Sequence, residues 1–127
     1  MADIKMVCVM RTDLRNTDGQ RIPKGKYVAQ AGHAYVALAT QYPAKDPKGE
    51  LHKQWFDNSF VKIALQTNSL EDLLNIYMSA LDAGLNVTLV TDKGDTQFGG
   101  VPTITCIGLG PDYSIEIDKF TGHLKSL

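Results

Sequence analysis

Cationic side chains gather where a helix is predicted to begin, near residue 24. Arg21, Lys24 and Lys26 lie there, although the N-terminus of a helix carries the positive end of its dipole and favours Asp, Glu, Ser or Thr. Cations beside free backbone N–H groups form a pocket for an anion, and phosphate is the natural guest. A set of solvated lysines at a frayed helix end would have the same sequence. The local pattern leaves both interpretations open.

A second candidate for chemistry is the polar, glycine-rich stretch LVTDKGDTQFGGVPT, residues 89–103. Its apolar part ends at Val90, and Asp92 is the first acid that follows. A plain turn needs only about two to five residues, so this connection is longer than folding alone requires. A hairpin decorated with ordinary turn-forming acids is the structural alternative.

The pattern of apolar residues predicts strands that alternate with helices. The predicted strands are 4–10, 60–66, 85–90 and 103–110, and the predicted helices are 24–42, 68–84 and 111–122, with a short helical turn at 51–56. Strands separated by helices favour parallel pairs, whereas the closely spaced last two strands favour an antiparallel pair. We therefore expect a single α/β sandwich built on a mixed sheet.

This order of elements relates the two candidate regions to each other. If the first and third strands run in the same direction, Lys26 and Asp92 lie at the same carboxyl edge of the sheet. Ligands of open α/β sheets bind at that edge. The polar segment 92–97 would then form one wall of a cleft, and the region around Lys26 would form the other.

Composition restricts the class of protein. The chain has 127 residues, about one domain, with 43% hydrophobic and 21% charged residues, which is typical of an ordinary globular protein. No apolar run approaches the roughly 18 residues of a membrane span, and the N-terminus lacks the layout of a signal peptide, so a cytoplasmic protein is expected. The formal net charge of -1 means that nucleic acid would have to bind a local basic patch.

Other kinds of site receive less support from the sequence. Cys8 and Cys106 lie within apolar runs and are predicted to be buried free thiols. His33, His52 and His123 have no metal-ligand spacing with a cysteine or with one another, which argues against a zinc site. The sequence contains no G-x-S-x-G, no P-loop and no G-x-G-x-x-G motif.

Three motifs taken together resemble a known family. GKYVAQAGHA (25–34), TDKGDTQ (91–97) and IDKFTGHL (117–124) are similar to the second of the two unrelated peptidyl-tRNA hydrolase families, the archaeal and eukaryotic type. The resemblance implies one domain over 1–127, with a mixed four-stranded sheet, helices on both faces and often a homodimer. It implies hydrolysis of the ester between a peptide and the 3′ ribose of tRNA, without a metal or other cofactor and away from membranes.

The resemblance also assigns functions to particular residues. The functional lysine of the family falls on Lys26, and a glutamine on the same helix falls on Gln30. The cleft aspartate falls on Asp92, the cleft threonine on Thr96 and a second threonine on Thr103. Asp92 would orient or deprotonate a water, helped by Thr96, and Lys26 would stabilise the oxyanion or hold a terminal phosphate.

Basic residues around this cleft are expected to contact phosphates without regard to sequence. They are Arg11, Arg15, Arg21, Lys24 and Lys93. One position departs from the family, because Asp95 stands where an arginine is usual, a difference of two charges facing a polyanionic substrate. Two alternatives therefore stay open: a non-catalytic member of the fold that binds RNA or protein, and a hydrolase of smaller acyl esters.

Overall fold

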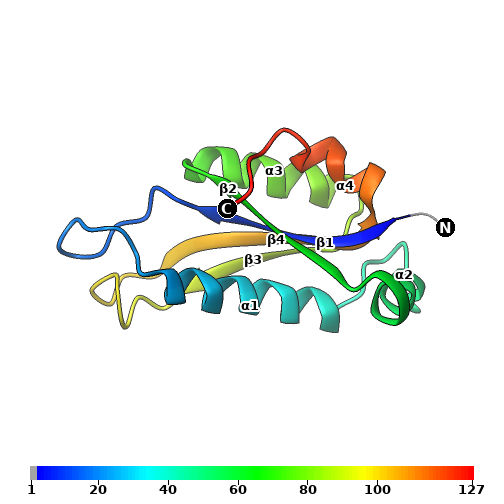
Figure 1. The fold of residues 1–127 in the computed structure, drawn as a ribbon, viewed down its shortest axis with the longest axis horizontal. Coiled ribbons are helices and arrows are strands. Elements are labelled where there is room, and N and C mark those ends of the chain that lie inside the picture. Colours follow the sequence, from blue (N-terminus) through cyan, green and yellow to red (C-terminus); the bar gives the residue numbers. More distant parts are fainter. Residues whose placement is uncertain (1–2) are drawn as a thin grey trace.

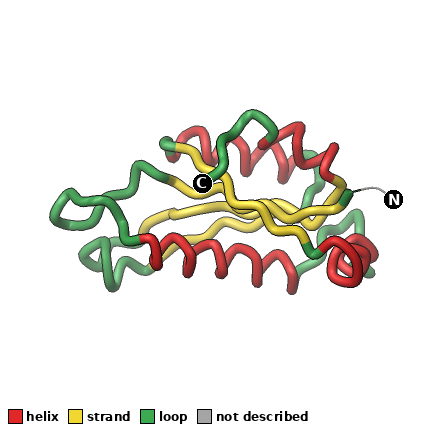
Figure 2. The backbone as a smooth tube through the Cα atoms, viewed as in Figure 1, coloured by secondary structure: helices red, strands yellow, loops and turns green. Residues whose placement is uncertain are grey.

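The computed structural model describes residues 3–127. The strands are β1 (Ile4–Arg11), β2 (Val61–Thr67), β3 (Val87–Asp92) and β4 (Thr103–Tyr113). The helices are α1 (Lys24–Thr40), α2 (Glu50–Gln54), α3 (Leu70–Asp82) and α4 (Ser114–Thr121), and a π-helical turn, η1 (Trp55–Ser59), follows α2. Figures 1 and 2 show α1 below the sheet and α3 and α4 above it.

The sheet has the strand order β2-β1-β4-β3. β1 pairs with β2 in parallel, and β4 pairs antiparallel with both β1 and β3. This arrangement confirms the expected three-layer α/β sandwich with a mixed four-stranded sheet and helices on both faces. Because β1 and β3 both oppose β4, they run in the same direction, and the chain leaves both strands at one edge of the sheet.

The core lies on both faces of the sheet, which explains why its strands read as continuous apolar runs. On the α1 face, Cys8 and Cys106 pack with Ala31 and Ala34 of α1. On the opposite face, a second cluster joins strand residues to α3 and α4: Val7, Val9, Leu65, Leu73, Ile76, Ala80, Leu85, Val87, Ile107, Leu109 and Ile117. Both cysteines are buried free thiols, as predicted.

One predicted boundary is wrong. Residues 111–113 were expected to begin the last helix, but they continue β4, and α4 begins at Ser114. The strand continues because Asp112 and Tyr113 pair with the first residues of β1. Asp112 is buried, and its Oδ2 accepts a hydrogen bond from Lys45 Nζ at 2.8 Å, so its charge is balanced within the fold.

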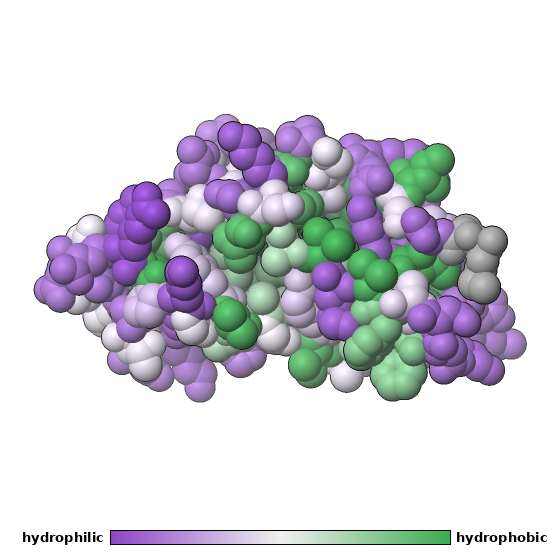
Figure 3. All heavy atoms as spheres, in the orientation of Figure 1, coloured by the Kyte–Doolittle hydropathy of each residue, from purple (hydrophilic) through white to green (hydrophobic). Residues whose placement is uncertain are grey.

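The surface is mixed in polarity. Figure 3 shows hydrophilic side chains gathered at the end of the molecule that carries the 12–23 loop, with hydrophobic groups nearer the centre of this face. None of the helices described within residues 3–127 has the length and apolar character needed to cross a membrane.

Close contact between α1 and the sheet gives a first prediction. A Cβ atom added at Gly108 of β4 would lie 2.6 Å from Leu38 Cδ1 and 3.0 Å from Thr88 Cγ2. We expect Gly108→Ala to lower the free energy of unfolding by about 1–3 kcal/mol, because α1 must move or its side chains must leave their rotamers. Denaturant unfolding followed by circular dichroism measures this change.

Gly32 provides the matched control. It lies inside α1, and a Cβ atom there would meet nothing within 4 Å. Gly32→Ala should therefore raise the free energy of unfolding by about 0.5–1 kcal/mol through helix propensity alone. Equal effects of the two substitutions would show that the approach of α1 to β4 does not depend on the missing side chain of Gly108.

Candidate active site

The first turn of α1 meets the end of β3 through an ion pair. Lys26 Nζ lies 2.9 Å from Asp92 Oδ1, and the two side chains are only 18% and 13% exposed. The same ammonium group donates to Thr96 Oγ1 at 3.1 Å. The common direction of β1 and β3 produces this contact, because the chain enters α1 from the edge at which Asp92 ends its strand.

Gln30 and Thr105 support the ion pair from the interior. Gln30 lies one helical turn after Lys26, and its Nε2 donates to Asp92 Oδ1 at 3.3 Å. Its Oε1 accepts a hydrogen bond from Thr105 Oγ1 at 2.6 Å. Gln30 is 3% exposed and Thr105 is fully buried. Since only the oxygen of an amide accepts, the hydroxyl of Thr105 fixes the orientation that turns the Gln30 NH₂ group toward Asp92.

A β-bulge brings Thr105 into this position. Val90 pairs with Cys106, but the next residue, Thr91, pairs with Ile104, so Thr105 is the extra residue of β4. Cys106 packs on the α1 face and Ile104 packs against the opposite core. Thr105 and Cys106 therefore both face α1, whereas strict alternation would turn Thr105 away. Bulges beside functional sites commonly redirect a side chain in this manner.

The environment of Asp92 keeps its carboxylate ionised. The hydrogen bond from Lys26 lowers the pKa of Asp92 from its ordinary value, and this effect outweighs the opposing effect of burial. The backbone N–H of Gly94 donates to Asp92 Oδ2 at 2.8 Å and acts in the same direction. Gly94 has a φ of 86°, and a Cβ atom there would lie 2.2 Å from the carbonyl oxygen of Val101. The turn that returns this N–H to Asp92 therefore requires glycine.

The ion pair lines an open cavity of about 560 Å³. Its walls come from α1, from β3 and from the loop after β3: Lys26, Gln30, His33, Ala37, Thr88, Leu89, Val90, Thr91, Asp92, Lys93, Asp95 and Thr96. Lys93 and Asp95 are exposed at its rim and carry opposite charges. We call this the Lys26–Asp92 cavity. It combines a carboxylate that accepts three hydrogen bonds, an ammonium group paired with that carboxylate, and access for a ligand.

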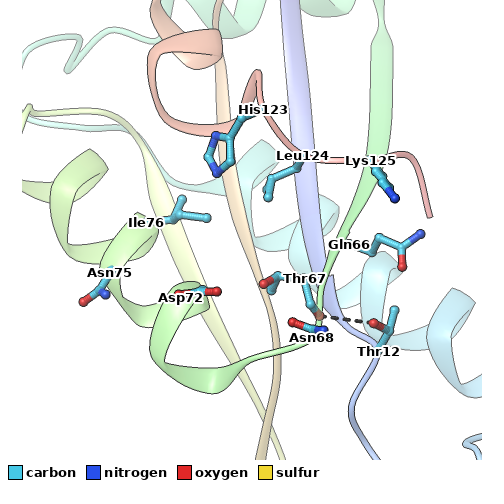
Figure 4. Close-up of a pocket in the computed structure, with 10 residues that line it drawn as sticks. All are labelled: Thr12, Gln66, Thr67, Asn68, Asp72, Asn75, Ile76, His123, Leu124 and Lys125. Atoms are coloured by element: carbon cyan, nitrogen blue, oxygen red, sulfur yellow. Dashed lines mark hydrogen bonds between the residues drawn. The ribbon is translucent and has the colours of Figure 1, made fainter.

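Two larger cavities lack such a pair. One, of about 630 Å³, lies between β2, α3 and the C-terminal segment, and Figure 4 shows polar side chains from these elements around it. The second, of about 760 Å³, lies beside the start of α1 and is lined by Arg21, Lys24 and Tyr27 among others. Arg21 and Lys24 thus lie close to the Lys26–Asp92 cavity but line a different hollow.

Two further residues singled out from the sequence lie outside the cavity. Thr103 stands opposite Asp92 in the sheet register, but its Oγ1 donates to the carbonyl oxygen of Val101 at 2.9 Å. The guanidinium group of Arg11 donates to both carboxylate oxygens of Asp13, at 2.9 and 2.8 Å, and to a main-chain carbonyl of β4. This pairing lowers the pKa of Asp13 and balances the charge of Arg11.

The two loops that frame the site are fixed to each other. Leu14 and Ile22 of the 12–23 loop form a small buried cluster with Phe98 of the loop after β3. Within the first loop, the side-chain Oδ1 of Asn16 accepts hydrogen bonds from two backbone N–H groups. The loops therefore fix the position of the segment around Thr96 relative to the start of α1.

The structure brings together four of the residues singled out from the sequence: Lys26, Gln30, Asp92 and Thr96. Sequence reasoning missed Thr105, and the available signal was a polar residue between the apolar residues Ile104 and Cys106. Within residues 3–127, no group of three or more His, Cys, Asp or Glu side chains is placed to hold a metal ion.

Comparisons with a family model and with individual proteins lead to the same family. The model of the family described as Peptidyl-tRNA hydrolase PTH2 matches residues 4–127. The peptidyl-tRNA hydrolase of Methanocaldococcus jannaschii is 36% identical over 124 residues, which cover 98% of this chain and 100% of that protein. The enzyme of the same name from Sulfolobus acidocaldarius is 39% identical over 127 residues, with 98% and 100% covered. That of Nanoarchaeum equitans is 40% identical over 104 residues, with 82% and 88% covered.

These matches extend over the strands, helices and loops that build the Lys26–Asp92 cavity. The matched segment includes the first turn of α1, the end of β3 and the bulge of β4. The chain belongs to the PTH2 family of peptidyl-tRNA hydrolases.

Proposed function

We propose that this protein hydrolyses peptidyl-tRNA at the ester between the peptide and the 3′ ribose, which returns tRNA to translation. The observation that carries the proposal is the Lys26–Asp92 pair in the wall of an open cavity, in a chain of the PTH2 family. A non-catalytic member of the fold would have no need to keep this partly buried pair, its supporting amide and its supporting hydroxyl together.

In the proposed reaction, the carboxylate of Asp92 holds the attacking water. An ionised carboxylate offers about four lone-pair positions. Lys26 and Gln30 use Oδ1, and the backbone N–H of Gly94 uses Oδ2. One position on Oδ2 therefore remains to accept a hydrogen bond from water, and the other bonds fix its direction.

Lys26 couples the two requirements of ester hydrolysis, an activated water and a stabilised oxyanion. While it binds Asp92, it keeps the carboxylate a weak base, because it is the main cause of the low pKa. As the carbonyl oxygen becomes negative, the ammonium group shifts toward it. Asp92 then loses its strongest stabilising contact and becomes a better proton acceptor when the water attacks.

Binding of the RNA is assigned to cations beside the site. Arg21 and Lys24 lie at the start of α1, and Lys93 lies at the rim of the cavity. Such contacts with phosphate give affinity without sequence preference. Arg11 contributes less to this binding because Asp13 already balances its charge.

We also propose that the protein acts in the cytoplasm as a homodimer. Phe56, Phe60 and Val61 form an exposed apolar patch around η1 and the start of β2, with exposures of 68%, 49% and 40%. A dimer that covered this patch would remove apolar surface from water, which favours association.

The role of Asp92 gives the central test. Asp92→Asn keeps the shape of the side chain but removes its charge, so turnover of N-acetyl-aminoacyl-tRNA should fall by about 10²-fold or more. Circular dichroism should show an unchanged fold, and tRNA should still bind. Asp82→Asn, at the exposed end of α3, is the control and should keep full turnover. Near-normal turnover by Asp92→Asn, assayed in EDTA to remove metals, would exclude the mechanism.

The effect of Lys26 on Asp92 is measurable without turnover. The folded-state pKa of Asp92 is lowered, so its carboxylate stays charged above the ordinary Asp value of about 3.9 and is protonated only at lower pH. The stability that this charge contributes is present above that value and is lost as pH falls through the folded pKa.

We expect Lys26→Met, which keeps the apolar stem, to raise the pKa of Asp92. The substitution removes the hydrogen bond that lowers this pKa most, whereas the effect of burial, which raises it, remains. Carboxyl-detected NMR titration of both proteins gives the two values directly. An unchanged Asp92 pKa in Lys26→Met would contradict the coupling between the two residues.

The departure at Asp95 predicts a change in RNA affinity. Asp95→Arg replaces an anion at the rim by a cation, so tRNA should bind more tightly at low salt. The slope of log K against log salt should become steeper by up to about 0.9 for one added phosphate contact. Asp82→Arg, at the exposed end of α3, is the charge-matched control. If wild-type turnover of small acyl esters exceeds that of peptidyl-tRNA and neither substitution alters tRNA binding, the small-ester alternative is favoured.

A further inference from the structure

The two edges of the sheet differ in whether they are covered. β2 forms one edge, where the Gln66 N–H donates to the Lys125 carbonyl at 3.0 Å. The N–H of Leu127 donates to the carbonyl of Ala64, also at 3.0 Å. β3 forms the other edge, and within residues 3–127 it pairs with β4 alone. An uncovered edge strand is a template for pairing with another extended chain.

Hydrogen bonds at the start of β3 identify which main-chain groups face the open edge. The carbonyl of Asn86 accepts from a main-chain N–H of β4 at 2.9 Å. The next carbonyl, that of Val87, accepts instead from Gln41 Nε2 at 2.7 Å and so points away from β4. Main-chain groups alternate in direction along an antiparallel strand. Leu89 and Thr91 therefore also turn their N–H and C=O groups toward the open edge.

The Lys26–Asp92 cavity follows this edge. It is lined by every residue from 88 to 92. Because successive side chains point to opposite faces of a sheet, a cavity that touches five consecutive residues meets the strand at its edge. His33 and Ala37, on successive turns of α1, form the facing wall. The open main-chain groups and the proposed reacting groups thus belong to one continuous cavity.

We propose that the peptide part of the substrate binds as an added strand on the open edge of β3, paired through its main chain with Leu89 and Thr91. This inference rests on the proposed function. Pairing through the main chain gives affinity that is independent of side chains. It suits a substrate in which the ester is constant and the peptide sequence varies.

The geometry also fixes the direction and the length of the bound peptide. β3 runs toward Asp92, and the ester carbonyl is the C-terminal carbonyl of the peptide. The peptide therefore runs parallel to β3, with its C-terminal residue beside Asp92 and earlier residues beside Thr91 and then Leu89. At Val87 the carbonyl is already occupied by Gln41, so pairing extends over only about four residues, at about 3.3 Å per residue.

A series of substrates of increasing length tests the proposal. N-acetylated peptides of one to six residues, esterified to the same tRNA, are compared by kcat/KM. We expect a rise of about tenfold or more from one to four residues, because each main-chain hydrogen bond gives about a two- to tenfold gain, and no rise beyond. N-methylation of the peptide nitrogens in this segment should abolish most of the rise. A flat series, or equal rates for methylated and unmethylated peptides, would overturn the proposal.

Two substitutions at one position separate the main chain from the side chain. Thr91→Pro removes an N–H that points away from β4, so no bond within the sheet is lost. It should reduce the ratio of kcat/KM between the four-residue and one-residue substrates. Thr91→Val removes only the hydroxyl and should keep this ratio. Because each ratio is measured within one variant, general damage to the fold does not imitate the effect. Equal ratios in both variants would contradict main-chain pairing.

A binding experiment distinguishes failure of this inference from failure of the proposed function. If no tRNA ester of any length is hydrolysed, the proposed function fails. A four-residue peptide joined by an amide to 3′-amino-3′-deoxyadenosine then tests the edge directly. Slowed amide hydrogen exchange at Leu89 and Thr91 on binding would support pairing, and unchanged exchange would overturn it. Protection that depends on protein concentration without ligand would assign the edge to a second copy of the chain and would equally overturn the proposal.

Discussion

The ion pair between Lys26 and Asp92 is the interaction on which the site depends. Each charge lies in a partly buried position, where it loses part of its hydration and the opposite charge compensates for that loss. The pair forms only if the chain leaves β1 and β3 at the same edge of the sheet, and the mixed topology ensures this by placing β4 antiparallel between them. The whole fold determines the directions of these strands, and these directions allow Lys26 Nζ to come within 2.9 Å of Asp92 Oδ1.

The groups around Asp92 leave its carboxylate little freedom. Gln30 is itself held by Thr105, which reaches it only because of the bulge in β4, and Gly94 reaches the other carboxylate oxygen only through a backbone conformation that favours glycine. Hydrogen-bond partners that are themselves held maintain a reacting group within a narrow range of positions. The structural features that look irregular, a bulge and a left-handed turn, are therefore those that orient the carboxylate.

The sequence predicted those features of the site that depend on the order of strands and helices along the chain. The order of strands and helices predicted the approach of Lys26 to Asp92 on the condition that the first and third strands run in the same direction. The pairing of both strands with β4 fulfils this condition. Thr105 could not be predicted, because strict alternation places it on the wrong face. The pairing of Arg11 with Asp13 depends on rotamers that the sequence does not specify. The end of β4 was misplaced because residues 111–113 are held by pairing with the start of β1, a contact between distant parts of the chain.

Helix α1 separates two kinds of surface, and this separation fits a substrate made of two chemically different parts. Lys24 and Tyr27 face a cavity that also contains Arg21, whereas Gln30 and His33 face the open edge of β3. A polyanion gains most from the first surface, and an extended chain with free main-chain groups gains most from the second. Under the proposals made above, RNA and peptide would lie on either side of the first turn of α1. The linkage between them must then cross that turn, where the ammonium group of Lys26 stands beside Asp92.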